Sequence, residues 1–212
     1  HTLFDAIRDC LRPDLVVRVR GLDGGDPQRS AGALRLLAAR REDRGYLLTQ
    51  LPGRTVLHAA GFTVTQCDPL RLADMIAEAL PAAEPGNLGR VVLPPDLSTE
   101  VGVAQARQVS ATDDTLRLWD SGDEPGDLAG RRLLDIVPGR QGSIEVAQGM
   151  SRFGPRGRTV RQLRWRDLAD DGRYLIRDGA PRTATGVDRR GLIDAINEEI
   201  ITVVRAIKDE RV

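Results

Sequence analysis

The sequence contains the same short phrase twice, as EDRGYLLTQ at residues 42–50 and DDGRYLIRD at residues 170–178. Each copy places an acidic pair and a Gly/Arg pair before a tyrosine, which two aliphatic residues follow. Two stretches of helical spacing correspond in the same way; their apolar residues are Leu72, Ile76 and Leu80 in the first and Leu192, Ile196 and Ile200 in the second. The repetition indicates two copies of one folding unit. Chance resemblance between two strand meanders is the alternative.

The first copy is predicted to contain a helix, four strands and a second helix. The first helix covers residues 2–11 and ends before Pro13, because proline stops a helix. Alternating or apolar runs bounded by turn residues predict the strands, which cover 14–20, 32–40, 44–51 and 54–66. The second helix, over 68–80, is expected to be capped by Asp68, with Pro69 at its first position.

The second copy repeats this order after a polar middle stretch. Residues 89–97 are predicted to be extended, residues 98–122 to form short helices, and Asp127 to cap a helix that stops at Pro138. The strands that follow are expected over 142–150, 159–168, 172–178 and 182–186. Asp188 is expected to cap a long helix whose buried apolar stripe comprises Leu192, Ile196, Ile200, Val203 and Ile207.

Short connections between the strands predict hairpins, and hairpins build antiparallel sheets. We therefore expect an α+β fold of two pseudo-twofold halves, each an antiparallel sheet flanked by helices. The expected boundaries are 1–97 for the first half, 98–138 for a helical connection and 139–212 for the second half.

Composition and charge exclude several classes of protein. Lys+Arg and Asp+Glu number 31 each, so no overall field would attract a polyanion. No run of 18 apolar residues is present, so we expect no membrane-spanning helix. Cys10 and Cys67 have neither metal-site nor redox-motif spacing and are expected to be buried thiols of a reducing compartment.

Few residues could carry catalysis or bind a metal. His58 is predicted to lie mid-strand on a core-facing side. The enzymatic alternative is a hydrolase or transferase whose site lies in the missing N-terminal part and whose activity depends on His58. Asp23 and Asp26 lack the spacing of a calcium loop and are more typical of turns. The sequence therefore predicts no catalytic residues, no metal site and no cofactor.

One segment, 152–166, concentrates arginine beside Phe153 and Trp165. Arginine interleaved with aromatic residues can bind phosphates and stack on bases. A nucleic-acid-binding protein that uses this segment is therefore the alternative function, through Arg156, Arg158, Arg161, Arg164 and Arg166. A solvated strand face is the competing interpretation.

The order of these segments resembles the EspG family of type VII (ESX) secretion chaperones. In the first half the resemblance is carried by VVRVRG, a loop, LRLLAARREDRGYLLTQ, DPLRLADMIAEALP and RVVLP. In the second half it is carried by GSIEVAQGMS, GRYLIR and GVDRRGLIDAI. Members usually have another strand and helices before this region, which implies that the first half is N-terminally truncated here.

The resemblance implies a cytoplasmic chaperone without catalysis, of mycobacterial or related actinobacterial type. It would bind PE–PPE heterodimers for export and shield the apolar tip of the PPE helical hairpin, as a monomer or weak homodimer. The family's partner-contacting loop corresponds to Gly21–Ala31, a segment longer than a hairpin needs. A tolerated surface insertion is the other interpretation of its length.

Within this loop the implied partner-binding residues are Leu22, Asp23, Asp26, Gln28 and Arg29. Leu22 is its only large apolar residue and would insert into the apolar tip. The charged residues would fix the register at the rim. We expect the loop to be poorly ordered in the free protein and to order on the partner.

Overall fold

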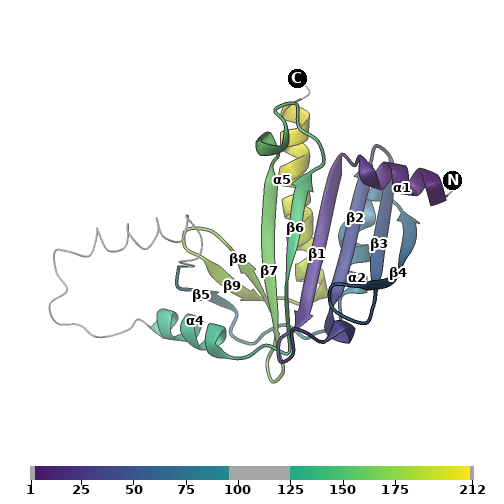
Figure 1. Ribbon diagram of the computed structural model, residues 1–212. Helices are drawn as coiled ribbons and strands as arrows, with labels where there is room; N and C mark the ends of the chain where they lie inside the picture. Colours follow the sequence, from purple (N-terminus) through teal and green to yellow (C-terminus); the bar gives the residue numbers. More distant parts are fainter. Residues whose placement is uncertain (1–2, 96–124, 211–212) are drawn as a thin grey trace.

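The computed structural model describes residues 3–95 and 125–210 (Figure 1). A single nine-stranded sheet, in the order β4-β3-β2-β1-β6-β7-β8-β9-β5, forms the centre of the fold, and neighbouring strands run antiparallel. The strands are β1 (Leu15–Asp23), β2 (Leu34–Arg41), β3 (Arg44–Pro52), β4 (Ala59–Cys67), β5 (Arg90–Val92), β6 (Arg140–Gln148), β7 (Val160–Leu168), β8 (Gly172–Arg177) and β9 (Thr183–Gly186). The helices are α1 (Leu3–Leu11), α2 (Leu72–Ala79), α4 (Pro125–Asp135) and α5 (Arg189–Asp209). The predicted α+β class and antiparallel sheet are confirmed.

The two predicted halves meet at the pair formed by β1 and β6. This pairing runs from Leu15 opposite Gln148 to Asp23 opposite Arg140. Outward from it, the strands follow in sequence order on each side, β2-β3-β4 and β7-β8-β9. Both halves therefore build one continuous sheet, and the repeated phrases lie on its third strands, β3 and β8. A twofold rotation that relates the halves stays a prediction. The short helices predicted over 98–122 fall outside the described residues.

Helices α2 and α5 cover one face of this sheet, behind the strands in Figure 1. The main core lies between them and inward-facing residues of β1, β2, β6 and β7. Ile76 of α2 and Ile196 of α5 are fully buried there, as their apolar stripes predict. The buried apolar residues of this core include Leu15, Val17, Val19, Leu36, Leu72, Ile76, Ile144, Val146, Leu163, Trp165, Leu192, Ile196 and Val203.

The tyrosines of the repeated phrase face the other side of the sheet, where each is fully buried. The Tyr46 hydroxyl donates to the Asp9 carboxylate of α1 at 3.0 Å. The Tyr174 hydroxyl donates to the Asp171 carboxylate and accepts the Leu88 backbone N–H at 2.9 Å. Burial and the bond to Asp171 raise the pKa of Tyr174 to about 12, so the hydroxyl stays protonated. The repeated phrase thus supplies each half with one buried, hydrogen-bonded tyrosine.

Removing the Tyr174 hydroxyl tests this role. Tyr174→Phe is expected to lower the free energy of unfolding by about 1–3 kcal/mol, because the Leu88 N–H loses its acceptor and the charged Asp171 carboxylate loses a donor. Urea denaturation measures the change. Tyr46→Phe should behave similarly, because the buried Asp9 carboxylate loses the hydrogen bond from the Tyr46 hydroxyl and keeps its ion pair with Arg44 at 3.1 Å. Wild-type stability in both variants would show that the hydroxyls are not structural.

Burial differs from the sequence pattern in three places. In α1 the apolar residues Leu3, Phe4, Ile7 and Leu11 are exposed, and the helix instead buries Ala6 and Asp9, because Asp9 binds Tyr46 and Arg44. Ile200 of α5 is only half-buried, and Glu199 is buried in its place. The Glu199 carboxylate accepts from Arg161 at 2.8 Å and pairs with Arg177 at 3.1 Å, which ties α5 to β7 and β8.

The third correction concerns the strand predicted over 54–66. β4 begins only at Ala59, after a turn, and His58 is exposed rather than buried in the core. β4 is an edge strand of the sheet, and none of its residues is buried, although apolar and polar residues alternate along it. Phe62, for example, is 63% exposed. The ring nitrogen Nδ1 of His58 lies 2.7 Å from the Thr55 hydroxyl.

Candidate functional site

The loop between β1 and β2 is shorter than the sequence predicts. The pairing of β1 with β2 ends at Gly21, which lies opposite Leu34. The strand β1 itself continues to Asp23, because β6 still pairs with it there. On the other side, Ser30–Gly32 form a short 3-10 turn. The irregular part is therefore residues 24–29.

Hydrogen bonds within the loop fix its turns. The Asp23 carboxylate accepts the backbone N–H groups of Gly25 at 3.0 Å and Asp26 at 3.3 Å, and Asp26 in turn accepts from Gln28 at 3.1 Å. Arg29 lies 3.9 Å from the Asp23 carboxylate. These are the local side-chain-to-backbone bonds that favour Asp in turns. The predicted disorder of the free loop stays a prediction.

Gly24 anchors the start of the loop to the second half of the chain. Its N–H donates to the Gly139 carbonyl at 3.1 Å, and a Cβ at this position would lie 1.9 Å from the Pro138 carbonyl oxygen. No side chain could occupy that space without displacing the backbone. The loop is therefore held against the segment that leads into β6.

The structure separates the predicted partner-binding residues into two groups. Asp23, Asp26 and Arg29 lie together in the loop, and Gln28 is exposed beside them. Leu22 precedes them on β1, opposite Gln141 of β6, and is 37% exposed. It faces the side of the sheet that α2 and α5 leave uncovered, where it lines a cavity.

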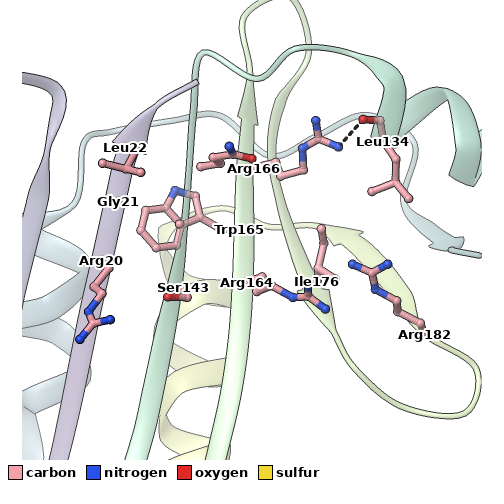
Figure 2. Close-up of a pocket in the computed structure, with 12 residues that line it drawn as sticks. Arg20, Gly21, Leu22, Leu134, Ser143, Arg164, Trp165, Arg166, Ile176 and Arg182 are labelled. Atoms are coloured by element: carbon pink, nitrogen blue, oxygen red, sulfur yellow. Dashed lines mark hydrogen bonds between the residues drawn. The ribbon is translucent and has the colours of Figure 1, made fainter. Parts of the chain in front are cut away.

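This cavity has a volume of about 500 Å³ (Figure 2). Four guanidinium-bearing side chains contribute to its walls together with three aliphatic ones, and no carboxylate lines it among the described residues. We call it the arginine-lined cavity. Its lining residues are Arg20, Gly21, Leu22, Leu134, Gln141, Gly142, Ser143, Arg164, Trp165, Arg166, Ile176 and Arg182.

The arginines of the cavity differ in their contacts. Arg166 donates to the carbonyls of Leu133 and Leu134 at 2.9 Å each, at the C-terminal end of α4. Arg164 and Arg182 both pair with Asp178, at 2.5 Å and 3.2 Å. Burial, and then the neighbouring Arg182 guanidinium, lower the pKa of Arg166. The guanidinium groups of Arg166 and Arg182 are therefore close enough to repel each other.

The Trp165 side chain lies in the main core, on the face of the sheet that α2 and α5 cover, and its ring packs against two glycines. A Cβ on Gly142 would approach its ring to 2.1 Å, and one on Gly21 to 2.9 Å, so the indole can lie flat against the sheet only because both positions are glycine. Trp165 is 2% exposed, and its Nε1 atom is buried without a hydrogen-bond acceptor. A buried donor without an acceptor is unusual in a native protein.

The arginine-rich segment does not form one surface. Arg161 lies on the face covered by α5, where it pairs with Glu199, whereas Arg164 and Arg166 lie on the opposite face. Arg156 is exposed in the short 3-10 turn Pro155–Gly157, and Arg158 is exposed directly after that turn. The segment therefore supports no continuous phosphate-binding track, and nothing in the structure favours the nucleic-acid alternative.

Sites for chemistry are not found in the part of the chain that the structure describes. That part contains no group of three or more His, Cys, Asp or Glu side chains that could hold a metal ion. Burial and, second, the Asp9 carboxylate raise the pKa of the Cys10 thiol to about 11, and burial also raises the pKa of Cys67. Both cysteines are free and partly buried thiols of low reactivity. Within the described ranges, none of the helices combines the length and the apolar character that a membrane crossing requires.

Comparisons with known proteins match this architecture to a family. The EspG family model matches residues 2–198. A similar solved structure is that of the Mycobacterium tuberculosis type VII secretion system chaperone EspG5 in complex with a PE25–PPE41 dimer. The two chains share 13% sequence identity at a TM-score of 0.55, and the similarity covers 97% of this chain and 76% of the other. Among curated proteins, none matches significantly. The match over nearly the whole sequence shows that the chain belongs to the EspG family.

Proposed function

We propose that this protein is a cytoplasmic chaperone that binds PE–PPE heterodimers for type VII (ESX) secretion and performs no catalysis. The observation that carries the proposal is the family match over residues 2–198. The shared fold with EspG5, which was solved with a PE25–PPE41 dimer, supports it. The partner would be held by its apolar PPE tip, since an exposed apolar helical tip is an aggregation hazard that a chaperone can cover.

The interface that we propose begins at the β1–β2 loop. Leu22 would contact the apolar tip, because it is exposed on the uncovered face of the sheet. Asp23, Asp26, Gln28 and Arg29 would contact the rim of the partner, where polar groups set the register.

The chaperone activity is tested by the solubility of the partner. PE–PPE pairs from the same genome are co-expressed with this protein and, separately, with an empty vector. At least one pair should move from the insoluble to the soluble fraction when the chaperone is present. The proposal fails if no pair gains solubility although the chaperone itself is soluble and folded by circular dichroism.

A further inference from the structure

The β6–β7 loop, residues 149–159, lies at the end of the sheet opposite to the β1–β2 loop (Figure 1). The pairing of β1 with β6 fixes this separation, because Leu15 lies opposite Gln148 at one end and Asp23 lies opposite Arg140 at the other. Eight steps of about 3.3 Å along a strand place the two ends roughly 26 Å apart. A ligand of the β6–β7 loop would therefore leave the β1–β2 loop accessible.

The β6–β7 loop exposes two large apolar side chains. Phe153 is 68% exposed and Met150 is 63% exposed. Single apolar residues on a protein surface are ordinary, whereas two of this size in one short loop indicate a contact surface.

The same loop is basic. Arg152, Arg156 and Arg158 are exposed, and residues 149–159 include neither Asp nor Glu. In the described part of the chain, the side chains of Arg156 and Arg158 have no ion pair and no hydrogen bond. Their charges are therefore available to an anionic ligand.

Hydrogen bonds anchor the loop to the rest of the fold. The buried Gln148 side chain donates to the Met150 carbonyl at 2.9 Å and accepts the Thr159 N–H at 3.3 Å, which closes the base of the loop. The Ser151 hydroxyl donates to the Glu210 carboxylate at the end of α5 at 2.8 Å. The exposed side chains are thus carried by a segment that is fixed at both its base and its side.

The acidic groups beside the loop are already engaged or offset. Glu210 also accepts the backbone N–H of Arg152 at 3.1 Å. Asp209 is exposed in the last turn of α5, where the charge of the exposed Lys208 balances it. The end of the sheet therefore keeps the positive character of the loop.

The aromatic ring and the arginines belong to one patch. The Arg152 guanidinium lies 5.3 Å from the centroid of the Phe153 ring. A Cβ on Gly157 would lie 2.5 Å from the Phe153 Cβ, so the 3-10 turn that carries Arg156 folds back close to Phe153. Gly154 permits this turn with a φ of 78°.

We propose that the β6–β7 loop binds the surface of a membrane that contains anionic lipids. Arginine binds phosphate oxygens through charge-assisted hydrogen bonds, and each arginine near an anionic leaflet contributes to the attraction. Phe153 and Met150 would enter the boundary between the headgroups and the acyl chains, where aromatic and apolar side chains are favoured. The contact would be peripheral and reversible.

A lipid surface fits this loop better than a nucleic acid or an acidic protein segment. The loop protrudes beyond the strands beside the end of α5 (Figure 1), and a protruding tip can enter a deformable surface without a matching groove. Lipids also present phosphates and apolar chains in adjacent layers, as the mixture of arginine and apolar residues requires. A nucleic acid would engage the arginines but would leave Met150 in water. The membrane site does not rest on the proposed function, because the proposed PE–PPE interface lies at the other end of the sheet.

Vesicle flotation with the untagged full chain tests the proposal. The vesicles consist of phosphatidylglycerol and phosphatidylcholine, or of phosphatidylcholine alone, and the bound fraction is measured against the lipid concentration. The protein should bind the anionic vesicles saturably and about tenfold or more tightly than the neutral ones, because three arginines meet the charged surface. Added salt should weaken this binding.

Two matched pairs of substitutions then locate the site. Arg156→Glu should weaken binding to anionic vesicles about tenfold, and Phe153→Ser should weaken it about fivefold or more. The controls, Arg54→Glu and Leu57→Ser, change an exposed arginine and an exposed leucine of the β3–β4 connection at the opposite end of the sheet. Each control should alter the affinity by less than about twofold. Circular dichroism checks that all four variants remain folded.

The possible results separate the claims. Equal binding to the two kinds of vesicle, or equal effects within each matched pair, overturns the membrane site. Polyglutamate and inorganic phosphate serve as soluble probes in calorimetric titrations. Binding of either probe that depends on Arg156, without binding to anionic vesicles, shows that the loop recognises an acidic protein segment or free phosphate and overturns the assignment to lipid. If no PE–PPE pair is captured but anionic vesicles are still bound through this loop, the proposed function fails and the membrane site stands.

Discussion

Replacing Ile196 by alanine is expected to lower the free energy of unfolding by about 2–5 kcal/mol. Ile196 lies on α5 and is fully buried in the core between α5, α2 and the sheet. Truncation removes apolar contacts and leaves a cavity that the close-packed neighbours cannot fill. Chemical denaturation followed by circular dichroism measures the change.

The control for this prediction lies on the same helix. Ile201 is 49% exposed, so Ile201→Ala should change the stability by only about 0.5 kcal/mol. This comparison separates packing against the sheet from the helix propensity that both substitutions alter. Similar small effects of the two substitutions would show that α5 does not pack on the sheet as described.

Shortening the β1–β2 loop is expected to weaken PE–PPE capture at least about tenfold, equivalent to about 1.4 kcal/mol. The change replaces residues 24–31 by Asn-Gly, a sequence that favours a two-residue hairpin turn. It retains Leu22 and Asp23 on β1, whose pairing with β6 continues to Asp23. The melting temperature should stay nearly constant, since loop length has little effect on stability. Titration with a captured PE–PPE pair measures the affinity.

A second loop at the same end of the sheet provides the control. The β3–β4 connection spans residues 53–58, and its replacement by Asn-Gly should leave capture unchanged. Loss of capture in both variants would indicate general disturbance of that end of the sheet. Undiminished capture after shortening of the β1–β2 loop would place the interface on the sheet face or on the second half instead.

Much of the fold was predictable because its signals are local. Asp188 caps α5 as expected, since its carboxylate accepts the Gly191 N–H at 2.7 Å. Asp68 accepts the Leu70 N–H at 2.8 Å, but a 3-10 turn over Pro69–Arg71 precedes α2. Apart from β4, which begins only at Ala59, the strands of both meanders lie close to their predicted ranges, because alternation and turn residues mark them.

The orientation of α1 could not be read from its own pattern. Its apolar residues suggest one buried face, yet the helix contacts the sheet through Asp9. That choice depends on Tyr46 and Arg44, which lie on β3 and are remote in the sequence. Similarly, the burial of Glu199 depends on two arginines from other strands. Such partners are known only once the strand order is known.

The candidate site, like the fold, was only partly predictable from the sequence. The β1–β2 loop was predictable, because its length and its Gly and Asp content are visible in one stretch of sequence. The arginine-lined cavity was not, because Arg20 comes from β1, Ser143 from β6, and Arg182 from just before β9. The sequence drew attention to Arg164 and Arg166, but as part of a linear cluster. Their shared cavity is a product of the β1–β6 junction.

Co-purification tests the central claim most directly. The protein, tagged at one end, is co-expressed with each PE–PPE pair of its own genome, captured through the tag and passed over a size-exclusion column. We predict that at least one heterodimer co-elutes with it as a complex larger than either component. If every heterodimer elutes separately from a folded chaperone, this protein does not bind PE–PPE substrates and the proposed function is wrong.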